Sequence, residues 1–208
     1  MQPVSADEIP DFLAAVHHAF HGQVRPEDVA VVGAVLEPER TLAVRDGDRI
    51  VATTGVYSRR LTVPGGELPM AGVTQVGVLP SHRRRGLLTG LMRRQLNDVR
   101  EAGEAVAALW ASETAIYGRF GYGMATRAAE LDVSTLEARL RRPPELGAEL
   151  REPGEAKPAM AAIHDAARRD RPGMLDRPGA WWEFRMADPE HRRDGMSPLK
   201  AAVVDGEA

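Results

Sequence analysis

The stretch VTQVGVLPSHRRRGLLTGLM, residues 73–92, constrains the fold more than any other part of the chain. A run of alternating β-branched residues ends at Pro80, and an apolar stretch with helical spacing begins at Gly86. This pattern predicts a strand that passes through a short basic turn, Arg83–Arg85, into a helix. A helix start offers free backbone N–H groups and the positive end of the helix dipole, so the turn is a candidate anion site. A solvated surface turn is the alternative.

The elements around this junction predict an α+β domain. Ser5 and Glu8 form a capping box for a first helix, and Asp46-Gly47-Asp48 and Pro64-Gly65-Gly66 are turn sequences of two successive hairpins. The expected domain covers roughly 130 residues, enough for a core of its own. The expected elements are helices at 5–20, 26–36, 86–102 and 113–119, strands at 41–45, 50–57, 66–79 and 105–111, and two more strands within 124–133.

Beyond Leu140 the sequence changes character. Residues 141–158 hold four of the chain's 15 prolines in a charged, weakly periodic stretch, which predicts a linker. Helices are expected at 159–169 and 180–186 and a strand at 199–204. We therefore assign residues 1–140 to a first domain, 141–157 to a linker and 158–208 to part of a second domain.

The second part repeats the order of the chain's beginning. Helix, helix, strand and Asp-Gly turn occur in both, and AVRDGD at 43–48 resembles VVDGEA at 203–208. This similarity predicts a second, incomplete copy of the same domain, with Trp181 and Trp182 in its core. We expect half a domain to bury too little surface to be stable alone.

The composition narrows the classes of partner. A net charge of −3 gives no general attraction to nucleic acid, and the arginines of the turn lack interleaved aromatic residues. The longest apolar run, Val29–Leu36, is far too short to cross a bilayer. The chain has no cysteine, which excludes disulfides and thiolate ligands and suits a reducing compartment. We expect a soluble, cytoplasmic protein without nucleic-acid or membrane partners.

The turn and the strand before it suit one ligand shape. Residues Arg84–Thr89 supply backbone N–H groups and positive charge, and Gly86 lets the backbone approach an anion closely. The motif lacks the lysine and glycines of a GxxxxGK[ST] loop, so a nucleotide triphosphatase is not indicated. A ligand with a pyrophosphate and an amide-bearing arm would also pair its amides with Val76 and Val78, as an added strand does. Coenzyme A (CoA) has that shape.

Two motifs carry a family resemblance. QVGVLPSHRRRGLLTGLM resembles the acetyl-CoA-binding motif of the GCN5-related N-acetyltransferases (GNAT), whose mixed, mostly antiparallel sheet flanked by helices has the same order of elements. LWASETAIYGRFGYGMA, residues 109–125, is similar to a segment of the enhanced intracellular survival (Eis) acetyltransferases, and the likeness covers residues 1 to about 135.

The resemblance implies acetyl transfer from acetyl-CoA to a primary amine, either of an aminoglycoside-like polyamine or of a lysine side chain. It implies no metal, and it implies that Tyr117 is the general acid. The residues that match cofactor contacts of the family are Val76, Gly77, Val78, Arg84, Arg85, Gly86, Leu87, Leu88, Thr89, Ser112 and Glu113.

Tyr117 can also be weighed on its own chemistry. A phenol of pKa about 10 can protonate a thiolate leaving group of pKa about 8.5, at a mismatch of roughly 2 kcal/mol that a positive helix end would reduce. The other interpretation is a core tyrosine packed with Phe120 and Tyr122. The residue types alone favour the core, and the resemblance favours the acid.

Other assignments compete with these. His17 and His21 stand one helical turn apart but lack a third ligand, so a solvated helix end is expected there. Glu113 is either a base for the amine or a cap for the short helix after Ser112. A protein N-terminus is an alternative acceptor. A non-catalytic acyl-CoA sensor is the alternative function, and it would have no need of an acid at Tyr117.

Proteins of the Eis family continue through a full second acetyltransferase domain and a sterol-carrier-like domain. They place their terminal carboxylate in the active site as the base, and the resemblance implies a homo-oligomer for the full-length protein. We therefore expect the 208-residue chain to be truncated relative to them and to acetylate amines slowly.

Overall fold

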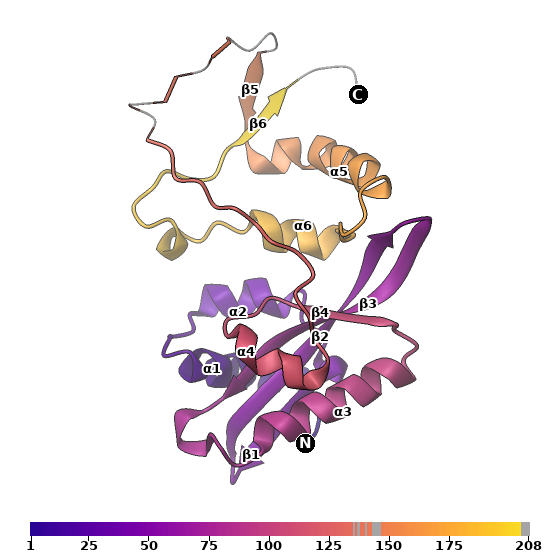
Figure 1. Ribbon diagram of the computed structural model, residues 1–208. Helices are drawn as coiled ribbons and strands as arrows, with labels where there is room; N and C mark the ends of the chain where they lie inside the picture. Colours follow the sequence, from indigo (N-terminus) through magenta and orange to yellow (C-terminus); the bar gives the residue numbers. More distant parts are fainter. Residues whose placement is uncertain (135, 137, 140, 143–146, 205–208) are drawn as a thin grey trace.

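The computed structural model describes residues 1–134, 136, 138–139, 141–142 and 147–204. Its main sheet has four strands in the order β1-β2-β3-β4 (Figure 1). The first three strands are antiparallel, and β4 joins β3 in parallel. The strands are β1 (Thr41–Asp46), β2 (Arg49–Val63), β3 (Gly66–Val78) and β4 (Val106–Leu109).

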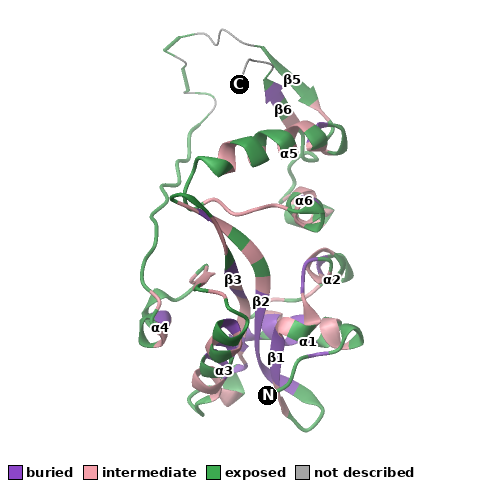
Figure 2. Ribbon diagram, turned by 90° about the vertical axis from the view of Figure 1, so that its right-hand side faces the viewer, coloured by how far each residue is buried: buried purple, intermediate pink, exposed green. Residues whose placement is uncertain are grey.

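Helices cover both faces of this sheet. Helices α1 (Ile9–Ala19) and α2 (Pro26–Gly33) lie on one face, and α3 (Leu87–Glu101) and α4 (Thr114–Tyr117) lie on the other (Figure 2). Phe12 of α1 and Leu91 of α3 are completely buried, so each face has its own apolar layer. No described helix is both long enough and apolar enough to cross a membrane.

The second part of the chain forms a smaller unit above the sheet (Figure 1). Its elements are β5 (Ala148–Arg151), α5 (Pro153–Arg169), α6 (Gly179–Met186) and β6 (Ala201–Val204). Strands β5 and β6 form a separate antiparallel sheet. Trp182 of α6 is 5% exposed and packs edge-on against His164 of α5, so it serves the core of this unit as expected.

The smaller unit docks on the part of β2 that β1 leaves free. The pairing of β1 with β2 ends at Gly55, and beyond it the edge of β2 takes up residues 173–176 as a short extra strand. The backbone hydrogen bonds run from Thr62 N–H to the Met174 carbonyl (2.9 Å), from Gly173 N–H to the Thr62 carbonyl (2.8 Å) and from Asp176 N–H to the Arg60 carbonyl (3.0 Å).

Side chains reinforce this docking. Arg59 forms an ion pair with Asp176 at 3.0 Å, and Tyr57 meets Trp181 edge-on with ring centroids 4.8 Å apart. On α2, the buried carboxylate of Asp28 accepts hydrogen bonds from His191 and Arg192 of the smaller unit. Burial acts to raise the pKa of Asp28, but these hydrogen bonds hold it below its usual value.

Most expected elements of the first domain are confirmed, and the Ser5 N–H donates to the Glu8 carboxylate at 2.9 Å as a capping box requires. The two strands expected within 124–133 are wrong. That segment has no regular secondary structure and joins no sheet, and its Leu131 is 83% exposed. A strand forms only where it pairs with a neighbouring backbone, and this segment does not pair with the outer edge of β4, which is unpaired among the described residues.

The stretch expected as a linker contains regular structure. Strand β5 lies inside it, and α5 begins at Pro153 rather than at residue 159. Proline fits the first position of a helix, so Pro153 can begin α5. Pro158 lies inside the same helix. The Asp205-Gly206 turn lies outside the described residues. The domain boundaries stay predictions.

His164 is an ionisable group inside the smaller unit. Its side chain is 11% exposed, and its Nδ1 atom is buried without a hydrogen-bond partner, since the Asp165 carboxylate is 3.8 Å away. Burial lowers the pKa of His164, and the nearby Arg177 guanidinium lowers it further. The fold therefore favours the neutral ring.

This environment predicts a stability that depends on pH. Above the ordinary histidine pKa of 6.5 both states are neutral, and below it the unfolded chain gains a proton that the folded protein resists. The free energy of unfolding should therefore fall as the pH drops below about 6.5. Urea unfolding at pH 7.5 and 5.5 should show a smaller loss for His164→Leu than for wild type. His18→Leu, on the exposed side of α1, controls for removal of a histidine. Equal losses for wild type and His164→Leu would contradict the assignment.

Candidate active site

Strand β3 has an open edge near its carboxyl end. Its parallel pairing with β4 ends at Val73 and Leu109, but β3 continues to Val78. On the other side β2 still pairs with it, with Thr53 opposite Gly77. Within the described residues, the backbone of 76–78 therefore faces no strand on the β4 side, and a ligand with amide groups can pair there.

A β-bulge lies at the point where β3 and β4 part. Thr53 pairs with Gly77 and Gly55 pairs with Thr74, so both Gln75 and Val76 stand opposite the one residue between them. Gln75 has φ 53°, a left-handed conformation that is uncommon for a residue other than glycine. A bulge of this kind bends the strand and turns its backbone away from the regular ladder.

The turn after β3 leads into an uncapped helix start. Gly86, with φ 78°, precedes α3 and provides no side-chain cap, and Arg84 also has a positive φ of 62°. The first backbone bond of the helix runs from Gly90 N–H to the Gly86 carbonyl at 3.0 Å. The N–H groups of residues 87–89 precede this bond and are available to an anion.

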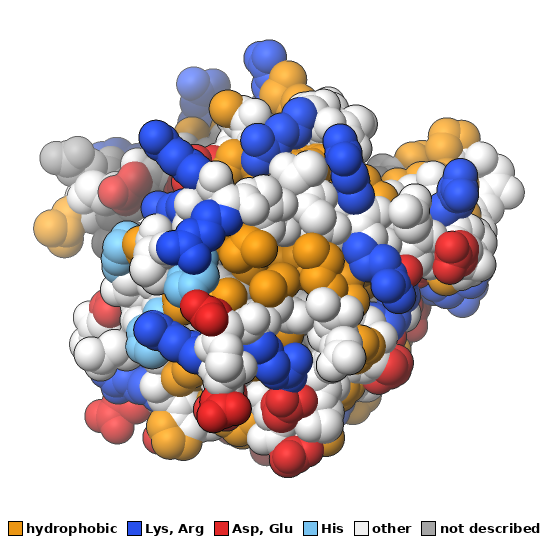
Figure 3. Space-filling model, turned by 90° about the horizontal axis from the view of Figure 1, so that it is seen from below, with side chains coloured by type: hydrophobic (Ala, Val, Ile, Leu, Met, Phe, Trp, Pro, Cys, Tyr) orange, Lys and Arg blue, Asp and Glu red, His pale blue; other side chains and the backbone are white. Residues whose placement is uncertain are grey.

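The three arginines of the turn have different roles. Arg83 donates to the Ala19 carbonyl at 3.1 Å and to the Val78 carbonyl at 3.4 Å, so it ties the turn to α1 and to the end of β3. Arg84 and Arg85 are exposed. Seen from below, the molecule shows Lys and Arg side chains around a strip of apolar surface (Figure 3). One arginine thus makes structural contacts, and the exposed positions of the other two leave them accessible to an anion.

Tyr117 is a buried phenol in the core beside β3 and α3. It ends α4, is 8% exposed, and belongs to the apolar cluster that also includes Val76 of β3 and Leu88 of α3. Its ring lies 5.9 Å from that of Tyr122, edge-on. The core packing and the proposed acid role are therefore compatible, because the cluster that holds Tyr117 also includes Val76 at the open edge of β3.

The electrostatics around Tyr117 differ from the sequence expectation. Burial raises the pKa of Tyr117, and the carboxylate of Glu113 raises it further, so the expected lowering by a positive helix end is wrong. Tyr117 therefore keeps its proton at neutral pH. Glu113 is exposed at the N-cap position of α4, and its carboxylate makes no capping hydrogen bond. Ser112 is also exposed, beside Glu113.

The structure brings two of the expected cofactor residues, Val76 of β3 and Leu88 of α3, into one cluster with Tyr117. Ser112 and Glu113 directly precede α4, the helix that ends with Tyr117. Val78 and Leu87 pack together in a neighbouring cluster. Sequence reasoning missed Thr53 and Gln75. Their sequence signal was weak, because only the folded sheet brings the Thr53 hydroxyl to the Gln75 carbonyl. Cofactor contact by the residues that the sequence predicts for it stays a prediction.

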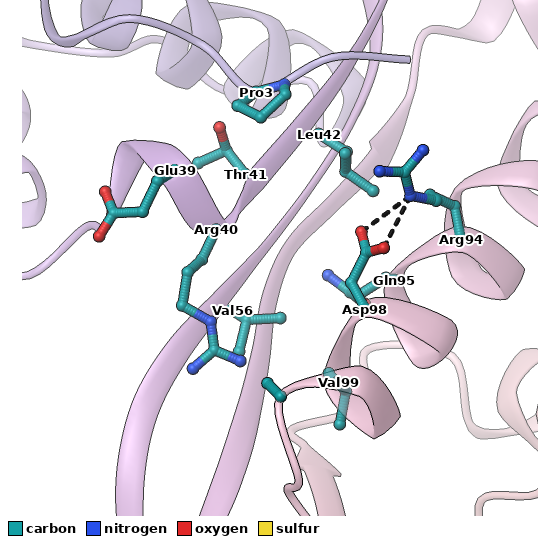
Figure 4. A pocket seen from close by; sticks show the side chains of 11 residues that line it. Pro3, Glu39, Arg40, Thr41, Leu42, Val56, Arg94, Gln95, Asp98 and Val99 are labelled. Atoms are coloured by element: carbon teal, nitrogen blue, oxygen red, sulfur yellow. Dashed lines mark hydrogen bonds and ion pairs between the residues drawn. The ribbon is translucent and has the colours of Figure 1, made fainter.

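A separate cavity of about 250 Å³ lies between the sheet and the carboxyl-terminal half of α3 (Figure 4). Ion pairs border it, between Arg94 and Asp98 at 2.7 Å and between Arg40 and Glu104. It shares none of the expected cofactor residues. Its lining consists of Pro3, Glu39, Arg40, Thr41, Leu42, Val56, Arg94, Gln95, Asp98, Val99 and Ala102.

The histidine pair lies at the carboxyl-terminal end of α1. His17 is in the last turn of α1, and His21 lies beyond its end with φ 60°. In the part of the chain that the structure describes, no group of three or more His, Cys, Asp or Glu side chains is placed to hold a metal ion.

The fold and the open strand edge beside a glycine-started helix define an acetyltransferase domain of the GNAT class. Residues 1–125 match the family described as acetyltransferase (GNAT) domain. The chain belongs to this family, and within it the chain is Eis-like. This confirms the family and the α+β fold expected from the sequence.

Three relatives illustrate the likeness. An uncharacterized N-acetyltransferase of Streptomyces avermitilis is 46% identical over 177 residues, which are 82% of this chain and 43% of the relative. N-acetyltransferase Eis of Mycobacterium tuberculosis is 35% identical over 193 residues, 88% of this chain and 48% of the relative. The crystal structure of Eis1 from Mycobacterium abscessus matches with a TM-score of 0.77 and 34% identity, over 98% of this chain and 50% of that one. The chain spans about half the length of the relatives it matches.

The two tyrosines of the site predict an alkaline titration. Burial raises the pKa of Tyr122 to about 12, and the pKa of Tyr117 is also raised. Between about pH 10 and the raised pKa of each tyrosine, the folded protein keeps a proton that the unfolded chain loses. The free energy of unfolding should therefore fall as the pH rises above about 10. Unfolding in urea at about pH 10.5 should increase tyrosinate absorbance at 295 nm. A Tyr117→Phe, Tyr122→Phe double variant should lose most of this increase, and an undiminished increase would contradict the assignment.

Proposed function

We propose that this chain is an acetyl-CoA-dependent N-acetyltransferase that acts on a primary amine. The observation that carries the proposal is the convergence of three features on one opening: the unpaired edge of β3, the uncapped start of α3 and the buried phenol of Tyr117. The family relationship supports the same reaction.

In this proposal the cofactor lies along β3 with its phosphates at the helix start. The amides of its arm pair with the backbone of 76–78, and the pyrophosphate accepts hydrogen bonds from the N–H groups of 87–89. Arg84 and Arg85 neutralise its charge from the solvent side. Ser112 and Glu113 border the thioester end. This arrangement places the acetyl group beside Tyr117.

The chemistry then requires one bond formed and one broken. The neutral amine nitrogen attacks the acetyl carbon, the new N–C bond forms, and the C–S bond breaks with both electrons going to sulfur. Tyr117 gives its proton to the departing thiolate. The amine's surplus proton goes to a base, for which the exposed Glu113 carboxylate or a water molecule is available.

The raised pKa of Tyr117 affects this step in two ways. It keeps the phenol protonated across the whole neutral range, so the acid form is always present. It also widens the mismatch with the thiolate beyond the roughly 2 kcal/mol of an ordinary phenol. Proton transfer from Tyr117 is therefore useful only late, when the C–S bond is largely broken and negative charge has built up on sulfur.

The acceptor is proposed from the family resemblance alone, as an aminoglycoside-like polyamine or a lysine side chain. Incubation with acetyl-CoA and a panel of such amines, read by release of free thiol, tests the activity directly. An acyl-CoA sensor would bind acetyl-CoA and release no thiol with any amine.

The anion cradle predicts the effects of two substitutions on cofactor affinity. Gly86→Val forces a β-branched residue into φ 78° in front of the free N–H groups, and Arg84→Glu reverses a charge. Each should weaken acetyl-CoA binding about tenfold or more in calorimetry. Arg93→Glu, an exposed charge reversal elsewhere on α3, is the matched control and should change affinity little. Unchanged affinity for both cradle variants would refute the cradle.

Removal of the proposed acid should separate binding from turnover. Tyr117→Phe keeps the ring in its cluster and removes only the proton donor. Acetyl-CoA affinity should stay within about twofold, while the rate of thiol release should fall about 100-fold. Tyr122→Phe, at the neighbouring half-buried tyrosine, is the control. Wild-type turnover by Tyr117→Phe with normal binding would exclude the acid role.

A further inference from the structure

We propose that Thr53 is a positioning residue, whose hydroxyl fixes the peptide between Gln75 and Val76 so that the Val76 N–H points into the opening between β3 and β4. There the N–H donates to the carbonyl oxygen of the acetyl group. This inference rests on the proposed function, because it assigns a role within the same site.

The contact that carries the inference is between neighbouring strands. Thr53 lies on β2, is 1% exposed, and its hydroxyl donates to the Gln75 carbonyl at 2.8 Å. The described backbone contains no cis peptide bond, and in a planar trans peptide the C=O and the N–H point in opposite directions. A hydrogen bond that holds the Gln75 carbonyl toward Thr53 therefore holds the Val76 N–H away from it.

The missing side chain of Gly77 shows on which face Thr53 lies. A Cβ at Gly77 would meet the Ala19 Cβ of α1 at 3.1 Å and the Thr53 Oγ1 at 3.3 Å. The Thr53 hydroxyl thus lies on the α1 face of the sheet. Gly77 leaves the space in which this hydroxyl reaches the bulge, and any larger residue would press on it.

The opposite side of the peptide is the side of the reaction. Val76 packs with the cluster of Tyr117 and Leu88, on the face covered by α3 and α4. An N–H directed that way meets a ligand on the open edge of β3, close to the proposed acid. A backbone donor held in place before the substrate arrives stabilises the negative charge that develops on the carbonyl oxygen during attack.

The bulge needs such an anchor. Gln75 holds a left-handed conformation that costs energy for a residue with a side chain, and the surrounding structure must maintain it. The buried Thr53 hydroxyl is a fixed partner for this peptide. Without it, the peptide is free to rotate and the N–H loses its direction while the strand register remains.

Strand β2 supplies a matched control for a lost threonine hydroxyl. Thr62 is also 1% exposed, but its Oγ1 is buried without a hydrogen-bond partner. Thr62→Val and Thr53→Val therefore make the same chemical change in the same strand. Only Thr53→Val removes a hydrogen bond to the bulge.

The test compares acetyl-CoA with CoA, because only the first has the carbonyl. Calorimetry on the 208-residue chain should show that Thr53→Val weakens acetyl-CoA about fivefold and leaves CoA unchanged. Infrared spectra with carbonyl-labelled acetyl-CoA should show the thioester band at lower frequency in wild type and near the free position in Thr53→Val. Thr53→Ser, which retains the hydroxyl, should restore the wild-type band, and Thr62→Val should match wild type.

The other possible results distinguish failure of the Thr53 role from failure of the proposed function. Suppose that wild type binds acetyl-CoA and that Thr53→Val has the same thioester band and the same ratio of acetyl-CoA to CoA affinity as wild type. That result overturns the role of Thr53 and leaves the proposed function standing. No acetyl-CoA binding by wild type overturns both. If Thr53→Val fails to fold by circular dichroism, Gly77→Ala takes its place, since the added methyl displaces the hydroxyl. If the thioester band of Gly77→Ala stays at the wild-type frequency, the inference is overturned.

Discussion

A β-strand carries hydrogen-bonding groups on both of its edges, and among the described residues β3 pairs with a strand on only one edge beyond Val73. The other features of the site follow from this constraint. Strand β4 stops at Leu109, the bulge at Gln75 bends β3 away from the regular ladder, and α3 begins a short turn after the strand ends. An extended ligand with amides and a charged end completes the edge, as a further strand would.

The smaller unit uses the same principle on the neighbouring strand. Where β1 leaves the edge of β2 free, residues 173–176 occupy it, and Tyr57 links the two units through Trp181. Tyr57 also approaches the Gln75 side chain, with 3.5 Å between its hydroxyl and the amide nitrogen. The docking therefore stabilises the long β2–β3 hairpin and reaches the residue that forms the bulge. The chain itself fills the free edge of β2, and the free edge of β3 is the one at which we propose that a ligand pairs.

Local signals made much of the fold and the outline of the site predictable. The capping box, the Asp-Gly turn and the glycine before α3 act over a few residues, so the sequence shows them directly. The role of Arg83 depends on a carbonyl at the end of α1, and the bulge depends on Thr53 across the sheet. Such contacts exist only once the chain has folded. The two strands expected within 124–133 are wrong for the same reason, because a strand depends on pairing with a distant backbone and this segment pairs with none of the described strands.

The unpaired edge of β3 also bears on colloidal behaviour. An exposed strand edge is a template on which other chains can pair, and proteins commonly protect such edges with bulges and with positive charge. Here the bulge at Gln75 lies at that edge, and the exposed Arg84 and Arg85 follow in the turn after the strand. The features that we propose for binding an anionic cofactor would thus also disfavour pairing with a second copy of the protein. A bound ligand would cover the edge altogether, so occupancy and resistance to aggregation are expected to rise together.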